Sequence, residues 1–393
     1  MNRRRWLAAG CAQCATLCAG GVLAQRPVPD PLPVAPWRSP QRFVRPDLAS
    51  DEGGLWALMD REEMRLRRSP FAIRDAALRD YIQGIACKLA AEHCPDVRVH
   101  AVRTPFFNAS MAPNGMMQVW SGLLLRVENE AQLAAVLGHE IGHYLQRHTL
   151  DRLRDAKARS AFATFMAAFG VVGLVGQLAT LASAFSFTRD QEREADSIGL
   201  NLMRDAGYDP RECSKVWDNL RAEAAAAPGA DEASRSPMFA THPPSDERSQ
   251  TLARLAAGAS GGFVGEAEFA ARLEPFRFGL LEDEIKRGQY DETLVLLARM
   301  LKRAPEQPDL LYVRGEALRL RGKDGDLDAA LADLRRAGAI DKAPAQLYRS
   351  LGYIHQRLGQ AEEARSAFSR YLELMPDAPD AGLIRTYLPE GKS

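Results

Sequence analysis

The sequence contains little of what would reveal its function at once. It has 7 histidines and 6 cysteines in 393 residues, and its 51 Lys and Arg residues balance its 51 Asp and Glu residues. That balance gives no electrostatic reason to expect a nucleic-acid partner or binding to an anionic membrane surface. A chain of this length is nevertheless large enough for two or three domains with separate cores.

The N-terminal stretch has no charged residue after its first few positions. Arg3, Arg4 and Arg5 precede residues 6–24, which are uncharged, rich in Ala, Gly and Cys, and end in small residues. This pattern predicts a cleavable signal peptide, residues 1–24, and export to the periplasm. The alternatives are a retained membrane anchor, for which the stretch is weakly hydrophobic, and a lipoprotein site at Cys11, before which the apolar run is too short.

Cysteine is scarce in the rest of the chain, where only Cys87, Cys94 and Cys213 occur. An exported protein can form disulfides. On one continuous helix the Cα atoms of Cys87 and Cys94 would lie about 10.5 Å apart, beyond disulfide reach. Pro95 predicts that the helix ends nearby and that the chain can fold back, so the sequence leaves a Cys87–Cys94 disulfide open.

The order of segments along the chain predicts a mixed domain after a linker. Prolines recur over residues 25–50, which indicates an extended tether. A helical region with charges of both signs follows over residues 52–89, then a strand over 97–102. Asn114-Gly115 between two apolar runs predicts a β-hairpin turn.

Helices dominate the region after the hairpin. Asn129, with Gln132 three residues later, predicts the N-cap of a long helix that continues towards residue 159. Two polar helices are expected over residues 189–206 and 211–227. Residues 224–250, rich in Ala, Pro and Ser, are expected to form a loop.

The last third of the chain repeats itself. One alignment of the segment with itself superposes Gly288 on Gly359. The preceding helices of two units match with Gly315 on Gly352. The pattern resembles the tetratricopeptide repeat of about 34 residues and predicts three helix pairs with a short cap over residues 271–393. The competing interpretation is a set of unrelated helical hairpins.

The strongest functional signal is "HEIGH" at residues 139–143. His139 and His143 lie on one face of a helix, so both imidazoles can aim at one point, and Glu140 lies beside them. In HExxH the two histidines bind zinc and the glutamate takes a proton from a water molecule. The alternative is a helix with two half-exposed histidines. A buried helix is favoured by its apolar residues Leu133, Val136, Leu137 and Ile141.

A catalytic zinc ion needs a third protein ligand, and the nearby residues do not provide it. The extended motif HExxHxxGxxH is excluded because Gln146 and Thr149 stand at its Gly and His positions. His148 is five residues past His143 and is expected to point away from the metal as a surface residue. The third ligand must therefore come from a distant segment.

The segment "EREAD" is the natural source of that ligand. Glu192 and Asp196 lie one turn apart on a predicted helix, and Glu194 points to another side. One carboxylate can bind zinc while the other accepts the N–H of a ligating histidine and fixes its tautomer. The competing interpretation is a solvated, charged helix.

These motifs together resemble a known family. "LGHEIGH", then "EREAD" about fifty residues later, with "FFNASMAPNGMMQVWSGLL" before them, are similar to the HtpX and CAAX-prenyl-protease family of zinc metallopeptidases, in its exported BepA-like branch with tetratricopeptide repeats. The resemblance implies an α+β, mostly helical, zincin-like metallopeptidase domain with a small sheet over residues 51–270. An all-α tetratricopeptide solenoid would follow over residues 271–393.

The resemblance also assigns roles to the motif residues. It implies one zinc ion per chain, held by His139, His143 and Glu192. Glu140 would be the catalytic base, and Asp196 the carboxylate behind a histidine ligand.

Further positions gain a role only through the resemblance. His242 in "THP" would otherwise be an exposed loop residue, but here it is implied as a fourth ligand that holds the enzyme latent. Asn108, Ala109 and Ser110 would line the substrate cleft, where an extended substrate could pair with a strand edge at residues 106–111 or 116–120. His242 and Arg248 are the candidates for stabilising an oxyanion.

Residues 160–188 contain no charged side chain and are long enough to span a bilayer. A single crossing would put His143 and Glu192 on opposite sides of the membrane, where they could not share a metal ion. The segment is therefore expected to form buried helices that cover the cleft. The alternative is a hairpin that enters a membrane and returns.

The expected function is that of a periplasmic zinc endopeptidase in protein quality control. Its substrates would be misfolded or outer-membrane proteins, and its repeats would bind a client or a partner. One rival is a repeat scaffold or chaperone whose zinc site is latent or silent. Another is a peptidase that trims only short peptides.

Overall fold

The computed structural model describes most of the chain: residues 37–158, 187–227, 238, 241–242 and 246–388. The predicted signal peptide, the start of the tether and nearly all of the uncharged stretch at 160–188 lie outside the described residues, so these predictions are neither confirmed nor contradicted. Within the described ranges, no helix combines the length and the apolar character needed to cross a membrane.

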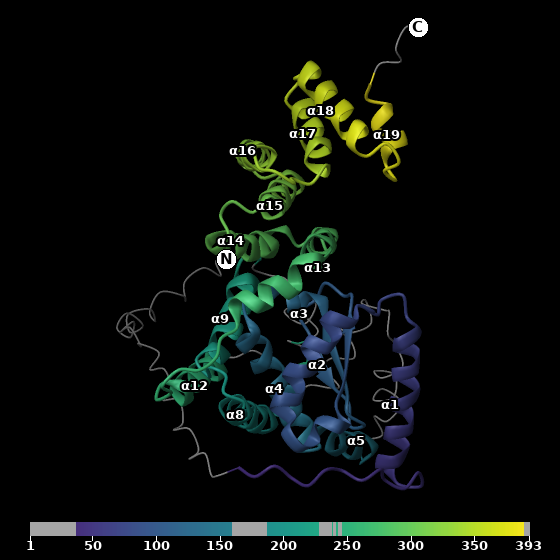
Figure 1. The fold of residues 1–393 in the computed structure, drawn as a ribbon, viewed down its shortest axis with the longest axis vertical. Helices are drawn as coiled ribbons and strands as arrows, with labels where there is room; N and C mark the ends of the chain where they lie inside the picture. Colours follow the sequence, from purple (N-terminus) through teal and green to yellow (C-terminus); the bar gives the residue numbers. More distant parts are fainter. Residues whose placement is uncertain (1–36, 159–186, 228–237, 239–240, 243–245, 389–393) are drawn as a thin grey trace, which may run out of the picture. The chain divides into compact units, whose positions relative to one another are not determined.

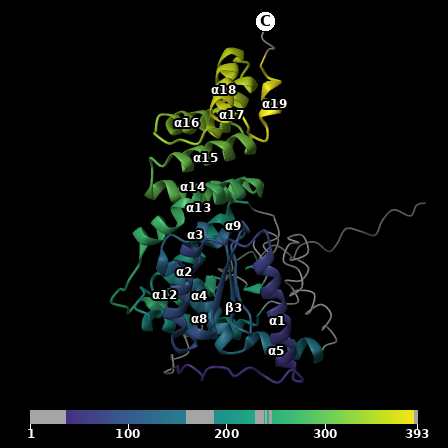
Figure 2. The ribbon, with the colours of Figure 1, turned by 45° about the vertical axis from the view of Figure 1, so that its right-hand side comes forward.

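Two helices and a small sheet open the described chain (Figures 1 and 2). The helices are α1 (Asp51–Arg68) and α2 (Ala76–Ala90). The strands are β1 (Arg98–Val102), β2 (Ala109–Met111) and β3 (Met116–Trp120), in the order β1-β3-β2. β3 pairs in parallel with β1 and antiparallel with β2.

The hairpin predicted at Asn114-Gly115 is confirmed. Gly115 has a φ of 86°, which a residue without a Cβ adopts readily, and its amide donates to the Ala112 carbonyl at 2.9 Å. The sheet order corrects one expectation, however. β3 is the central strand and has both edges paired, so a substrate cannot pair with residues 116–120. Among the described strands, β1 and β2 are the edge strands, and β2 contains residues 109–111 of the other expected pairing segment.

The chain reverses after α2 and closes a disulfide. A 3-10 turn, η1 (Ala91–Asp96), follows α2, and Ala91 has a φ of 47°. The reversal brings the Cα atoms of Cys87 and Cys94 to 4.5 Å, and their sulfur atoms are bonded. The sequence left this open because the outcome depends on where the helix ends. Cys213 is a buried free cysteine.

Within the described residues, six further helices belong to the first part of the fold. They are α3 (Ser121–Arg126), α4 (Glu130–Leu145), α5 (His148–Ala158), α8 (Arg189–Asp205), α9 (Glu212–Ala225) and α12 (Asp246–Ala256). The predicted start of α4 is confirmed, because the Asn129 side chain accepts from the Gln132 amide at 2.8 Å. Its predicted extent is wrong: α4 ends at Leu145, and Arg147, with a φ of 58°, separates it from α5. The loop expected over 224–250 is also too long, since α12 begins at Asp246.

Helices α4 and α8 approach so closely that glycine is required at their contact. A Cβ on Gly142 would lie 2.9 Å from the Ala195 carbonyl oxygen, and one on Gly199 would lie 2.8 Å from the His139 amide nitrogen. Carbon atoms do not approach backbone atoms so closely without a shift. The two helices that carry the motif residues are thus held backbone to backbone.

The C-terminal part consists of successive helices. They are α13 (Glu266–Lys286), α14 (Tyr290–Arg303), α15 (Pro308–Arg321), α16 (Asp326–Gly338), α17 (Gln346–Arg357), α18 (Ala361–Leu374) and α19 (Ala381–Arg385). Gly315 of α15 faces Leu334 of α16, and Gly352 of α17 faces Phe368 of α18. The two glycines superposed in the sequence therefore occupy the same place in two successive helix pairs. The tetratricopeptide assignment and the domain boundaries stay predictions.

Candidate metal centre

The HExxH segment lies on a buried helix. His139, Glu140 and His143 of α4 have relative exposures of 3%, 3% and 2%. Helix α8 begins with a capping box in which Thr188 and Gln191 satisfy each other's backbone amides. This start fixes the first turn of α8, which carries Glu192, against α4.

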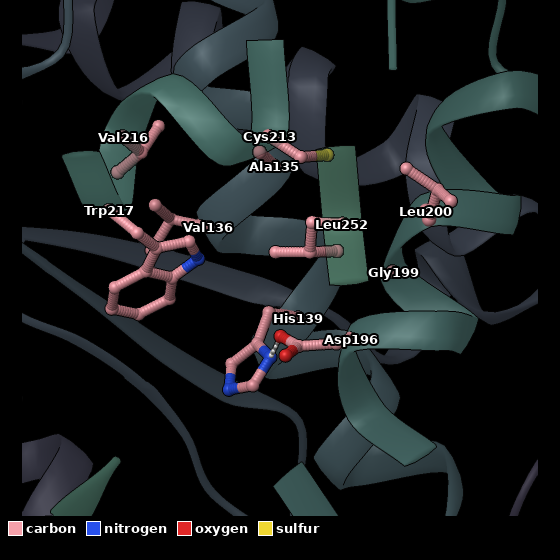
Figure 3. A pocket seen from close by; sticks show the side chains of 10 residues that line it. All are labelled: Ala135, Val136, His139, Asp196, Gly199, Leu200, Cys213, Val216, Trp217 and Leu252. Atoms are coloured by element: carbon pink, nitrogen blue, oxygen red, sulfur yellow. Dashed lines mark ion pairs between the residues drawn. The ribbon is translucent and has the colours of Figure 1, made fainter. Parts of the chain in front are cut away.

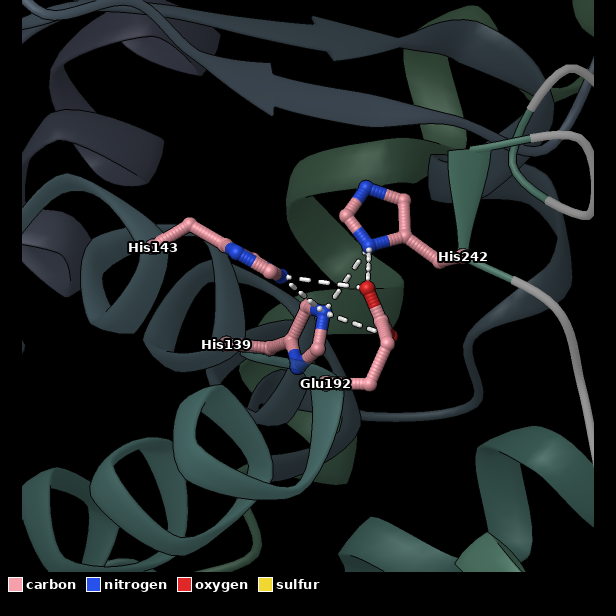
Figure 4. A group of neighbouring side chains, drawn as sticks. All are labelled: His139, His143, Glu192 and His242. Atoms are coloured by element: carbon pink, nitrogen blue, oxygen red, sulfur yellow. Dashed lines mark hydrogen bonds and ion pairs between the residues drawn. The ribbon is translucent and has the colours of Figure 1, made fainter. Parts of the chain in front are cut away.

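Ligand atoms from three segments converge here. Those of His139, His143, Glu192 and His242 all lie within 4.8 Å of one another (Figure 4). His139 Nε2 is 3.1 Å from His143 Nε2 and 3.1 Å from His242 Nδ1. Glu192 Oε1 is 2.8 Å from His242 Nδ1 and 3.4 Å from His143 Nε2. The structure thus brings together the three predicted ligands and His242.

The residues present fit a zinc ion. Bonds of about 2.0–2.1 Å in a tetrahedral site place neighbouring ligand atoms about 3.3 Å apart, close to the separations here. His139 Nδ1 lies 2.9 Å from Asp196 Oδ1, so the proton of a neutral ring is on Nδ1, and Nε2 turns a lone pair to the centre. Lone pairs and a carboxylate that face each other at this distance repel unless a cation lies among them.

The environment also sets the charge of each ligand. Burial lowers the pKa of His143 well below its usual value, which favours the neutral ring that a metal requires. Burial acts to raise the pKa of Glu192, but the charge of His242 and hydrogen bonds from His143 and His242 lower it overall. These surroundings therefore favour a neutral His143 ring and an ionised Glu192 carboxylate.

Asp196 lies behind His139, where the sequence predicted a carboxylate (Figure 3). It is also held by Arg248, whose Nη2 lies 2.7 Å from Asp196 Oδ1. The Arg248 guanidinium lies 4.3 Å from the centre of the Trp217 ring, and its Nη1 is 2.7 Å from Glu192 Oε2. Arg248 is buried and contacts both carboxylates, and its expected role in stabilising an oxyanion stays a prediction.

His148 corrects another expectation. It is 3% exposed and not on the surface. Arg147, just after the end of α4, has a left-handed backbone conformation that turns the chain. His148 Nδ1 therefore lies 2.8 Å from His143 Nδ1. His148 Nε2 is 3.3 Å from Glu194 Oε2. Sequence reasoning missed this contact because it assumed a continuous helix, and no residue pattern marks the break at an arginine.

Glu140 lies beside the same centre, near His242. Burial raises the pKa of its carboxyl, against the charges of His242 and His139. Its Oε1 lies 3.6 Å from His242 Nε2 and has no hydrogen-bond partner in the described part of the chain. The backbone of Met111, on the edge strand β2, acts to lower the pKa of Glu140.

His242 fills the remaining side of the cluster and is 3% exposed. The chain here is held in place because the Phe187 amide donates to the Thr241 carbonyl at 3.0 Å. Phe187 in turn stacks on His143, with 3.9 Å between ring centres. Burial acts to lower the pKa of His242, but the charges of Glu192 and Glu140 raise it overall.

The predicted cleft residues lie on or beside β2. The Asn108 carbonyl accepts from the Trp120 amide and the Ala112 amide donates to the Met116 carbonyl, so both point towards β3. In an antiparallel register the backbone groups of Ala109 and Met111 then point to the outer edge, and those of Ser110 towards β3. That edge leads to Glu140.

A buried HExxH helix with two inward imidazoles and a glutamate from a second helix defines a zinc metallopeptidase site. Comparison with known families agrees: residues 72–256 match the model described as Peptidase family M48. This region of the chain is therefore similar to peptidase family M48.

Individual relatives match the same region. The chain is 33% identical over 156 residues to the mitochondrial metalloendopeptidase OMA1 of Arabidopsis thaliana, which is 40% of this chain and 31% of that protein. It is 29% identical over 244 residues to the beta-barrel assembly-enhancing protease of Escherichia coli (strain K12), which is 55% of this chain and 47% of that protein. The chain therefore spans less than half the length of these relatives.

Proposed function

We propose that this protein is a zinc-dependent endopeptidase of the periplasm that degrades misfolded or outer-membrane proteins. The observation that carries the proposal is the convergence of His139, His143 and Glu192 with Glu140 beside them. Similarity to a protease named for β-barrel assembly supports the choice of substrate class. The uncharged N-terminal stretch supports export.

The chemistry follows from the residues around the centre. Zinc, when bound, supplies a Lewis acid that makes a water molecule acidic and polarises a peptide carbonyl. His139, His143 and Glu192 would hold it. Glu140 would accept the proton of the attacking water and pass it to the leaving amine, which suits a buried carboxyl with a raised pKa. Asp196 would keep the Nδ1 proton on His139 and so direct Nε2 inward.

Substrate would bind as an extended strand along the outer edge of β2. The backbone groups of Ala109 and Met111 face this edge, and the backbone of Met111 influences the pKa of Glu140. Pairing through backbone hydrogen bonds selects for an extended, unfolded segment and reads little of its sequence. This preference suits an enzyme that acts on misfolded chains. Asn108 and Ser110 would border the same cleft, and the C-terminal helix pairs, as tetratricopeptide repeats, would bind the client or a partner.

His242 would act as a latch. It occupies the side of the centre that a catalytic site leaves open for water and substrate, and it reaches both Glu192 and Glu140. With His242 in this place, the enzyme would be latent until a substrate or partner displaces the loop.

Glu140→Gln gives the direct test. The full chain should bind one zinc ion per molecule and degrade casein, and chelation followed by zinc should abolish and restore this activity. Glu140→Gln should keep the zinc and lose activity by about 10²–10⁴-fold, because it removes the proton acceptor but no ligand. Metal analysis and casein cleavage measure both.

The rival proposals give other results in the same experiment. A repeat scaffold with a silent centre would bind zinc and degrade nothing, in wild type and variant alike. A peptidase for short peptides would cleave these and leave casein intact. Either result would overturn the proposal.

A further inference from the structure

The two histidines of the HExxH motif are supported in different ways. His139 Nδ1 faces a carboxylate, Asp196, at 2.9 Å. His143 Nδ1 faces another ring nitrogen, Nδ1 of His148, at 2.8 Å. The second arrangement depends on the fold. The helix is interrupted at Arg147, and this interruption turns the His148 side chain towards His143 of α4.

Two ring nitrogens at this distance must share a single proton. Two N–H groups would collide, and two lone pairs would repel, so one nitrogen donates and the other accepts. If His143 turns the lone pair of Nε2 to the centre, its proton is on Nδ1, and His148 Nδ1 is the acceptor. The proton of a neutral His148 is then on Nε2, which lies 3.3 Å from Glu194 Oε2 and donates to it.

We propose that His148 is a positioning residue for the metal centre, in a hydrogen-bonded chain from His143 through His148 to Glu194. The chain fixes the tautomer of His143 with Nε2 facing the zinc ion, as Asp196 does for His139. This inference rests on the proposed zinc site and adds to it a residue that neither the motif nor its spacing indicates.

The surroundings hold the chain in place. His148 is 3% exposed, so water does not compete for its hydrogen bonds. The Phe187 ring stacks on His143 at 3.9 Å and lies 6.1 Å from the His148 ring, which limits rotation of both imidazoles. Glu194 lies on α8, as do Glu192 and Asp196. One helix thus supplies a ligand and the terminal acceptors behind both histidines.

A matched pair of substitutions tests the acceptor at His148. In His148→Asn the side-chain oxygen lies near the position of Nδ1 and can still accept, whereas His148→Leu has a similar size and no acceptor. Zinc affinity of the full chain is measured by competition with a chromophoric chelator. His148→Leu should weaken it by about 10–100-fold, as loss of a group behind a ligand usually does, and His148→Asn should stay within a few-fold of wild type.

Two further variants complete the experiment. Glu194 has a side chain that is 49% exposed, so Glu194→Ala should fold even where His148→Leu does not, and it should weaken zinc binding a few-fold. The control is His355→Leu. It removes a buried histidine of the C-terminal helices, whose Nδ1 lies 2.6 Å from Gln360 Oε1, and it should leave the zinc affinity unchanged.

The outcomes separate this inference from the proposed function. Equal losses of zinc affinity in His148→Asn and His148→Leu would show a purely structural role and overturn the inference. Wild-type zinc affinity in both His148 variants, or in Glu194→Ala, would overturn it as well. If the wild-type chain itself takes up no zinc, the proposed function fails.

Discussion

At the scale of single residues, the position of protons decides what the metal centre can do. Each histidine of the pair can bind a cation through Nε2 only if its own proton is on Nδ1, and each has an acceptor there, Asp196 or His148. Arg248 in turn neutralises the carboxylates that would otherwise repel each other in a dry site. The ligand set is therefore only the inner part of a larger hydrogen-bonded arrangement.

His242 gives a prediction at this scale. His242→Ala removes the group that occupies the open side of the centre, so basal cleavage of casein should rise severalfold while zinc remains bound by the other three residues. Activity assays and metal analysis check both parts. Unchanged proteolysis together with an unchanged metal environment, measured by X-ray absorption, would exclude the latch.

At the scale of elements, the contact between α4 and α8 determines whether the centre forms at all. The ligands come from two helices more than forty residues apart in sequence, and only close packing makes their atoms meet. Gly138, Gly142 and Gly199 allow this packing, since a Cβ at any of them would press on the backbone of the opposite helix.

Gly142→Ala and Gly84→Ala test this contact as a pair. Both replace a glycine inside a helix, and alanine has the better helix propensity by up to about 1 kcal/mol. A Cβ on Gly142 would collide with Ala195, whereas one on Gly84 would meet no atom within 4 Å. Gly142→Ala should therefore destabilise the fold by about 1–3 kcal/mol and weaken zinc binding. Gly84→Ala should be neutral or stabilising, and urea unfolding measures the difference. Equal changes in unfolding free energy in the two variants would mean that the fold does not depend on the close packing of α4 and α8.

At the scale of the whole described chain, the C-terminal helices are joined to the peptidase region by buried charges. Arg126 of α3 lies 2.7 Å from Glu284 of α13 and 2.7 Å from Glu223 of α9, and all three side chains are at most 5% exposed. Arg299 of α14 also reaches Glu223, at 2.6 Å. Charges removed from water must remain paired, so this junction specifies one arrangement of α13 and α14 against the peptidase helices.

Arg126→Met is expected to disturb that junction. Leaving Glu223 and Glu284 buried without this partner should cost about 3–5 kcal/mol at neutral pH. Arg336→Met is the control, because Arg336 is 48% exposed and its pair with Glu306 should contribute at most about 1 kcal/mol. Urea unfolding of both variants gives the comparison, and a loss as small as that of the control would contradict the role of the junction.

The same junction gives a pH dependence with a definite sign. Burial acts to raise the pKa of Glu284, but Arg126 and Arg287 lower it overall from its ordinary 4.5. A carboxyl with a lowered pKa in the folded state contributes stability above pH 4.5, and this is lost as the pH falls towards the lowered value. The difference in unfolding free energy between wild type and Arg126→Met should therefore become smaller below pH 4.5. A difference that is constant from pH 7 to pH 3 would contradict this.

Much of the candidate site could be predicted from the sequence because its chemistry depends on residue types at short, regular spacings. HExxH places two imidazoles on one helix face wherever that helix occurs, and a carboxylate pair at i and i+4 shares a face in the same way. The N-cap at Asn129, the turn at Asn114-Gly115 and the matched glycines of the C-terminal helices are local signals too, and the structure contains each of them.

What the sequence could not provide depended on contacts between distant segments or on a single backbone angle. The left-handed Arg147 brought His148 to His143, the order of strands closed the edge of β3, and the reversal at Ala91 joined Cys87 to Cys94. Spacing along a chain fixes directions only within one regular element. The amino-acid sequence alone thus shows which groups can bind a metal ion. Which of them meet depends on the fold, because packing between elements sets the distances between their atoms.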